Sequence, residues 1–105
     1  MADFSRVGSM DEFEQGVLYD RTVEGRHVIV VRNGDRFYAM RNACTHSGYL
    51  ITPGNLLEDG SVYCPAHGAV FRLEDGEPIE GPADDPLELY YVRLEGGDVL
   101  VAPPG

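Results

Sequence analysis

The strongest constraint on the fold is a pair of apolar runs joined by Asn33 and Gly34. Residues 27–32 (HVIVVR) carry β-branched side chains on both faces, which is typical of a buried central strand. An Asn-Gly pair supplies the positive φ angles of a tight hairpin turn. Residues 36–41 (RFYAMR) are therefore predicted to return as an antiparallel strand, and the sequence predicts a core built on a β-hairpin.

Short apolar runs separated by turn residues continue along the chain, which is typical of a β-sandwich or a small barrel. We expect one strand before this hairpin and a second hairpin near the C-terminus, around Gly96 and Gly97. Two further turns are expected where Asp precedes Gly. These strands and turns are residues 17–23, 87–94 and 99–102 and the pairs 59–60 and 75–76. The prediction is an all-β, antiparallel fold.

The one helical signal lies near the N-terminus. Ser9 and Glu12 fit a capping box, which predicts a short helical turn that runs through Glu14 and ends at Gly16. No phosphate-cradling glycine loop leads into a helix, and this excludes an α/β nucleotide-binding fold.

The length of 105 residues predicts one domain, 1–105, and 43% apolar residues suffice for a modest core. No apolar run approaches the ~20 residues that a membrane helix needs. Residues 1–6 lack the charged and apolar regions of a secretion signal. We therefore expect a cytoplasmic protein with no membrane partner.

The chain is strongly acidic, with 18 Asp and Glu against 8 basic residues and a net charge of −10. This excludes a nucleic-acid partner, because phosphate contacts require positive charge, and it disfavours an anionic membrane surface. Two interpretations stay open, solubility and steering toward a basic protein partner. The densest acidic group comprises Glu74, Asp75, Glu77, Glu80, Asp84, Asp85 and Glu88.

Both cysteines and two of the three histidines form two short clusters. Cys44 and His46 make the first, and Cys64 and His67 make the second, with residues 47–63 between them. Each cluster lies in a turn-rich segment between predicted strands, so its side chains can converge on one centre if the two loops stack tip to tip. A Cys44–Cys64 disulfide is conceivable, but it would leave the histidines unexplained.

A structural zinc site is the main alternative, because two cysteines and two histidines form a good tetrahedral zinc set. Zinc fingers, however, usually pair Cys with Cys and His with His. Here each cluster offers one thiolate and one imidazole, which suits a two-metal cluster with unlike ends. The third histidine, His27, is expected to be structural and distant from both clusters, since it lies in the predicted central strand.

The two clusters resemble the paired binding boxes of Rieske [2Fe–2S] proteins, in which two His replace two Cys on one iron. The boxes are residues 44–48 (CTHSG) and 64–71 (CPAHGAVF). Other stretches also resemble the family: 34–39 is similar to the hairpin before the first box, 81–83 (GPA) to the proline loop, and 86–92 to the strand that follows. The resemblance covers roughly residues 17 to 102.

The resemblance also indicates a branch of the family. Respiratory Rieske proteins brace their loops with a disulfide, but this sequence has Tyr49 and Ala66 at the matching positions. The high-potential branch carries a Ser and a Tyr whose hydroxyls donate hydrogen bonds to the cluster side, where this sequence has Ala69 and Phe71. Missing donors lower the potential, so we expect roughly −150 mV, at the low end of a range that extends to about +300 mV.

The resemblance implies an antiparallel sandwich or small-barrel base domain with a cluster-binding subdomain over about 41–81. It implies one [2Fe–2S] cluster per chain, held by Cys44, His46, Cys64 and His67. The implied function is one-electron transfer from a flavin-dependent ferredoxin reductase to a terminal aromatic-ring-hydroxylating oxygenase, with no small-molecule substrate and no catalysis by the chain itself. The alternatives are the small Rieske subunit of a nitrite reductase-type complex and a structural zinc-binding module.

Overall fold

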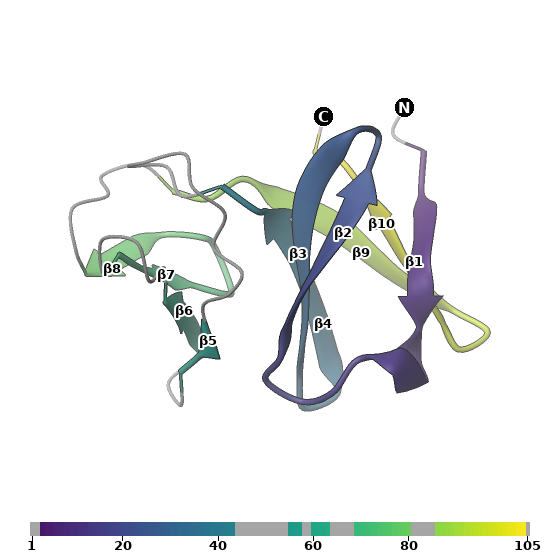
Figure 1. The fold of residues 1–105 in the computed structure, drawn as a ribbon, viewed down its shortest axis with the longest axis horizontal. Helices are drawn as coiled ribbons and strands as arrows, with labels where there is room; N and C mark the ends of the chain where they lie inside the picture. The colour runs from purple at the N-terminus through teal and green to yellow at the C-terminus, as the bar shows by residue number, and fades with distance from the viewer. Residues whose placement is uncertain (1–2, 44–54, 58–59, 64–68, 81–85, 105) are drawn as a thin grey trace.

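The computed structural model describes residues 3–43, 55–57, 60–63, 69–80 and 86–104, and these residues form two antiparallel sheets (Figure 1). The larger sheet has the strand order β1-β10-β9-β4-β3-β2. Its strands are β1 (Ser5–Ser9), β2 (Leu18–Val23), β3 (Arg26–Asn33), β4 (Arg36–Arg41), β9 (Leu89–Glu95) and β10 (Asp98–Ala102). The two edge strands approach each other, and Arg21 Nε on β2 donates to the Val7 carbonyl on β1 at 3.1 Å. The sheet is therefore a partly closed barrel.

The smaller sheet has the order β5-β6-β7-β8 and lies beside the barrel in Figure 1. Its strands are β5 (Asn55–Leu56), β6 (Ser61–Tyr63), β7 (Val70–Arg72) and β8 (Pro78–Glu80). The all-β prediction is confirmed. The subdomain boundaries of 41 and 81, and the single-domain span 1–105, stay predictions.

The central hairpin follows the predicted register. Asn33 pairs with Arg36, and Gly34 has a φ of +67° between them. Strand β3 lies between β2 and β4, and Val28, Ile29, Val30 and Val31 are all fully buried. The prediction of a central strand buried on both faces is confirmed.

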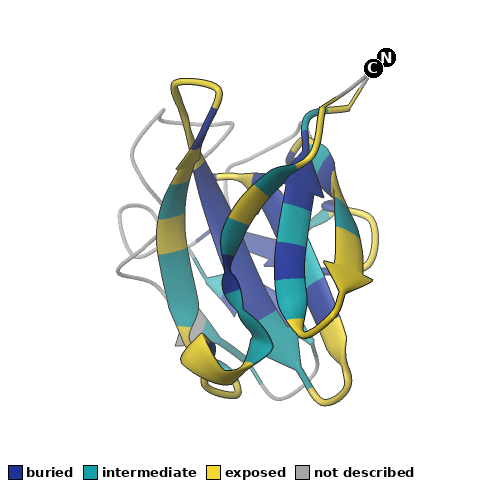
Figure 2. Cartoon of the chain, turned by 90° about the vertical axis from the view of Figure 1, so that its right-hand side faces the viewer, coloured by how far each residue is buried: buried dark blue, intermediate teal, exposed yellow. Residues whose placement is uncertain are grey.

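Two hydrophobic clusters meet at β3. Val28 and Val30 face the barrel interior with Phe13, Phe37 and Val99. Ile29 and Val31, the alternate residues of β3, face a second cluster that holds the small sheet against the barrel wall. The buried members of this second cluster are Ile29, Val31, Met40, Val62, Ala69, Phe71, Leu73 and Leu87. Because side chains alternate across a strand, one strand supplies both cores. Figure 2 shows the buried positions along the strands and exposed positions at most turns.

The structure differs from the sequence prediction at three places. The N-terminal segment contains strand β1, which the sequence did not predict. The helical turn covers only Met10–Glu12, because Phe13 is extended and buries its ring in the barrel core. Strand β9 begins at Leu89 rather than at residue 87, because the Leu87 N–H donates to the Gly76 carbonyl at 2.8 Å instead of joining the sheet. Among the described residues, no helix is long and apolar enough to cross a membrane.

Tyr90 provides a test of packing in the barrel. Its hydroxyl is buried and has no hydrogen-bond partner in the described part of the chain, although the residue is only 6% exposed. An unpaired buried polar group is destabilising, so Tyr90→Phe is expected to raise the free energy of unfolding by about 1 kcal/mol in urea denaturation. Tyr91→Phe is the control, since Tyr91 is 56% exposed, and it should leave that free energy unchanged. A loss of stability in Tyr90→Phe would show that the hydroxyl is paired.

Candidate metal centre

The four predicted ligands, Cys44, His46, Cys64 and His67, lie outside the described residues. So do Tyr49, Ala66 and the predicted proline loop at 81–83. The structure instead describes the strand ends that border these segments, and these strand ends define the candidate centre.

The strand ends form one row across the small sheet. Asn55 pairs with Tyr63, Tyr63 pairs with Val70, and Val70 pairs with Glu80. Residues 44–54 end beside Asn55, residues 64–68 connect Tyr63 to Ala69, and residues 81–85 begin after Glu80. The described residues that border both segments with Cys and His, and the one that precedes the predicted proline loop, therefore lie at the same end of the small sheet. Figure 1 shows the strands of this sheet side by side.

Buried apolar side chains lie directly below this row. Ala69 and Phe71 are both fully buried in the cluster that also contains Val62 of β6. Ala69 and Phe71 are the two positions at which the sequence analysis expected no hydroxyl group, in contrast to the Ser and Tyr of the high-potential branch. Apolar side chains therefore lie directly after residues 64–68, the segment with Cys64 and His67.

Asn42 directly follows β4 and lies two residues before Cys44, at the start of the segment with Cys44 and His46. The Asn42 N–H donates to the His27 carbonyl at 2.9 Å, and the Asn42 side chain donates to Asp20. His27 Nδ1 lies 3.0 Å from Asp20 Oδ2, which agrees with a structural role. The backbone of His27 therefore contacts a residue two positions before Cys44, while its distance from the two clusters stays a prediction. Sequence patterns gave no sign of Asp20, which is 22 residues away from Asn42 along the chain.

Gly76 binds the backbone of the chain just after residues 81–85, the segment with the predicted proline loop. It lies in the predicted Asp75–Gly76 turn between β7 and β8, and its carbonyl accepts the Leu87 N–H at 2.8 Å. Gly76 has a φ of +73°, and a Cβ built on it would lie 2.4 Å from the Leu87 carbonyl oxygen. This close approach requires glycine.

The acidic residues near this turn are partly paired. Arg72 Nη2 lies 2.7 Å from Asp75 Oδ2, and Arg72 Nε donates to Asp75 Oδ1 at 3.0 Å. The hydrogen bond from Arg72, followed by one from the Glu77 N–H, lowers the pKa of Asp75. Glu74, Glu77 and Glu88 are exposed, whereas Asp84 and Asp85 lie outside the described residues. The surface around this turn therefore retains an excess of negative charge.

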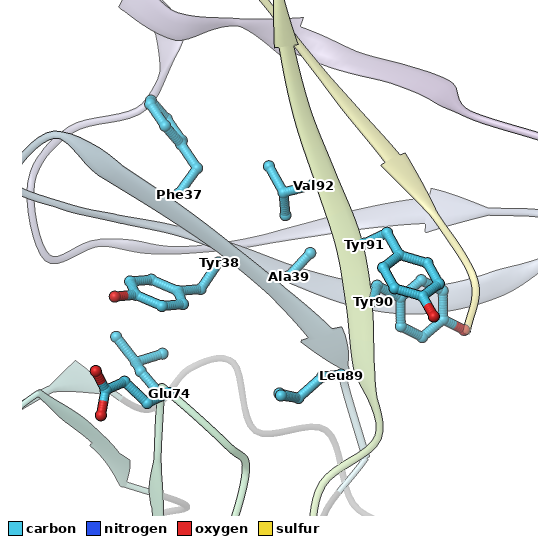
Figure 3. A pocket seen from close by; sticks show the side chains of 9 residues that line it. Phe37, Tyr38, Ala39, Glu74, Leu89, Tyr90, Tyr91 and Val92 are labelled. Atoms are coloured by element: carbon cyan, nitrogen blue, oxygen red, sulfur yellow. The ribbon is translucent and has the colours of Figure 1, made fainter. Parts of the chain in front are cut away.

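A groove of about 240 Å³ lies between β4, β9 and the turn after β7 (Figure 3). Tyr38, Glu74 and Leu89 line it from these three parts of the chain. The groove adjoins the end of β7 opposite to Val70, so it takes no part in the candidate centre.

Comparison with known proteins identifies the family. A family model described as "Rieske [2Fe-2S] domain" matches residues 3–91. The chain belongs to the Rieske [2Fe-2S] domain family. It therefore binds a [2Fe–2S] cluster, as the sequence predicted, and this finding favours the cluster over the zinc alternative. The donor types fit, because Rieske ligation needs two thiolates and two imidazoles, and the chain has two cysteines and three histidines.

The similar proteins and solved structures agree with this family assignment, and their names describe ferredoxins of dioxygenase systems. The chain is 41% identical over 71 residues to the 3-phenylpropionate/cinnamic acid dioxygenase ferredoxin subunit of Shigella flexneri serotype 5b (strain 8401), covering 68% of this chain and 67% of the relative. The ferredoxin of carbazole 1,9a-dioxygenase from Nocardioides aromaticivorans IC177 has a TM-score of 0.91 and 33% identity, covering 96% of this chain and 98% of that chain. A ferredoxin chain in a solved complex of reduced oxygenase and oxidized ferredoxin in carbazole 1,9a-dioxygenase has a TM-score of 0.86 and 30% identity, covering 94% and 92%.

Proposed function

We propose that this Rieske protein is a one-electron carrier that accepts electrons from a flavin-dependent ferredoxin reductase. It passes them to a terminal aromatic-ring-hydroxylating oxygenase and turns over no substrate itself. The observation that carries this proposal is the row of strand ends from Asn55 to Glu80, because the strands that adjoin both Cys- and His-containing segments in the sequence end side by side there. A relative at 30% identity has been solved in complex with its oxygenase, which supports an oxygenase partner over a nitrite reductase-type complex.

The ligand assignment is part of the proposal. Cys44 and Cys64 would hold one iron, and His46 and His67 would hold the other. When bound, the cluster supplies a one-electron redox couple. The chain's own contribution is to keep hydroxyl donors away, since Ala69 and Phe71 are buried and apolar. We therefore propose a potential of roughly −150 mV, at the low end of the Rieske range.

Electron exchange with both partners would occur in the cytoplasm, at the end of the small sheet where Tyr63 and Val70 lie. Electron transfer requires close approach of the two redox centres, so the partner would cover the segments that adjoin Tyr63 and Val70. The chain's net charge of −10 favours basic groups on that partner, through attraction that salt screens.

The test begins with the EPR spectrum of the dithionite-reduced protein and with iron and acid-labile sulfide analysis of the same sample. We expect a rhombic signal with a low average g value and about two irons and two sulfides per chain, as a single Rieske cluster requires. The reduced protein is then mixed without oxygen with the oxidised oxygenase component of carbazole 1,9a-dioxygenase. Loss of the ferredoxin signal and reduction of the oxygenase are the expected result.

Two outcomes would contradict the proposal. Colourless protein without sulfide would exclude the electron carrier altogether. A correct Rieske signal together with no electron transfer to this oxygenase, or to that of the 3-phenylpropionate/cinnamic acid system, would contradict the assigned partner class.

A further inference from the structure

Asn42 is a buried polar residue at the point where the chain leaves the barrel for the first cysteine segment. It is 1% exposed, and Ser61 is the other buried polar residue in the described part of the chain. The Asn42 side-chain Nδ2 donates to Asp20 Oδ1 at 2.9 Å, while its backbone N–H donates to the His27 carbonyl at 2.9 Å. Two separate hydrogen bonds therefore fix both the backbone and the side chain of this residue.

The acceptor of the side-chain bond is itself held in place. His27 Nδ1 lies 3.0 Å from Asp20 Oδ2 and 3.2 Å from Asp20 Oδ1. The Asp20 side chain is 36% exposed and that of His27 is 57% exposed, so the histidine ring lies on the outer side of the carboxylate. Asp20 belongs to β2 and His27 to β3, and the residue that they anchor follows β4. The network thus joins three consecutive strands at one point.

A carboxylate acceptor makes a stronger hydrogen bond than a neutral one. A buried amide is also costly to leave unpaired, so Asn42 has one strongly preferred orientation. This orientation is imposed two residues before Cys44. Groups that hydrogen-bond behind metal ligands orient those ligands, and their loss typically weakens metal binding.

We propose that Asn42, oriented by Asp20, is a positioning residue for the Rieske cluster. It sets the direction in which the chain enters the segment with Cys44, and so the place of that thiolate in the centre. This inference rests on the proposed function, because it takes Cys44 as a ligand.

The test compares Asn42→Leu, which keeps a similar volume but removes the amide, with Asp20→Ala, which removes its acceptor. Both variants are expected to release iron to a chelator roughly tenfold faster than the wild type, and to shift or broaden the EPR g values of the reduced protein. Asp20→Asn keeps an oxygen that accepts from Asn42, and is expected to restore both measurements to within about twofold of wild type. This rescue separates the hydrogen bond from the charge.

Two controls separate positioning from general effects. Asp98→Asn removes the same charge from β10, where Asp98 pairs with Arg6 at 3.0 Å, and it should not change the cluster. Val99→Ala weakens the barrel core without contacting the network, since Val99 is buried in the other hydrophobic cluster. At matched loss of thermal stability, Val99→Ala should keep the wild-type g values.

The inference is overturned if Asp20→Ala, which alters a partly exposed side chain, keeps both the wild-type rate of iron release and the wild-type g values. It is also overturned if Val99→Ala reproduces the spectral change. In either case, a normal wild-type signal that disappears in Cys44→Ser would leave the proposed function intact. A wild type without a Rieske signal would instead overturn the proposed function, and this inference with it.

Discussion

Cys64→Ser is expected to yield a protein that binds no [2Fe–2S] cluster, and Cys44→Ser is expected to do the same. The chain has only two cysteines, so no other thiolate can replace the missing ligand. A serine hydroxyl is a poor substitute, because iron–sulfur clusters are held by thiolates. The measurement is the visible absorbance together with iron and sulfide content, each of which should fall to background.

His67→Cys tests the other end of the proposed centre. A third thiolate should move the EPR spectrum of the reduced protein toward that of an all-thiolate cluster and lower its potential. His27→Gln is the matched control, because His27 contacts Asp20 and glutamine can also hydrogen-bond to that carboxylate. Its spectrum should remain that of the wild type. A cluster retained in Cys64→Ser, or an unchanged spectrum in His67→Cys, would remove that residue from the ligand set.

Gly76→Ala is expected to cause the largest loss of stability among the turn glycines with described surroundings. Its added Cβ would lie 2.4 Å from the Leu87 carbonyl oxygen and 3.3 Å from the Leu87 nitrogen, both backbone atoms. The backbone must shift to relieve this contact, which breaks the hydrogen bond from Leu87 to Gly76. We expect the free energy of unfolding in urea to fall by roughly 3 kcal/mol or more, near the upper end for single substitutions.

Gly25→Ala is the control for this experiment. Gly25 has a φ of +79°, close to the +73° of Gly76, but a Cβ built on it meets no atom within 4 Å. It should therefore show only the cost of a left-handed alanine, about 1 kcal/mol. Equal losses in the two variants would mean that the contact with Leu87 contributes nothing.

Much of the barrel could be predicted because its signals are local. The Asn33–Gly34 turn fixed the register of β3 and β4, and the unbroken run of β-branched residues marked β3 as buried on both faces. Strand β1 could not be predicted, since its sequence, SRVGS, has little apolar character. It is a strand because Ser5 and Arg6 pair with Val101 and Leu100 of β10, almost a hundred residues away.

The candidate centre likewise has features that local sequence predicts and features that depend on contacts between distant parts of the chain. The donor types were evident from the two clusters, and the ligand set itself stays a prediction. The alignment of Asn55, Tyr63, Val70 and Glu80 depends on strand pairing within the small sheet. The bond between Asp20 and Asn42 depends on strands that are separate in sequence. Neither arrangement leaves a periodic pattern that could be recognised beforehand.

The shared strand β3 has a consequence for how this protein can tolerate change. Val28 and Val30 serve the barrel, whereas Ile29 and Val31 serve the small sheet. A slip of one residue would exchange the two sets of side chains, so an insertion or deletion in β3 would damage both cores at once. Single substitutions, in contrast, can be directed to one core or the other by choosing even or odd positions. The packing of the barrel and the packing of the small sheet could therefore be altered separately within four consecutive residues.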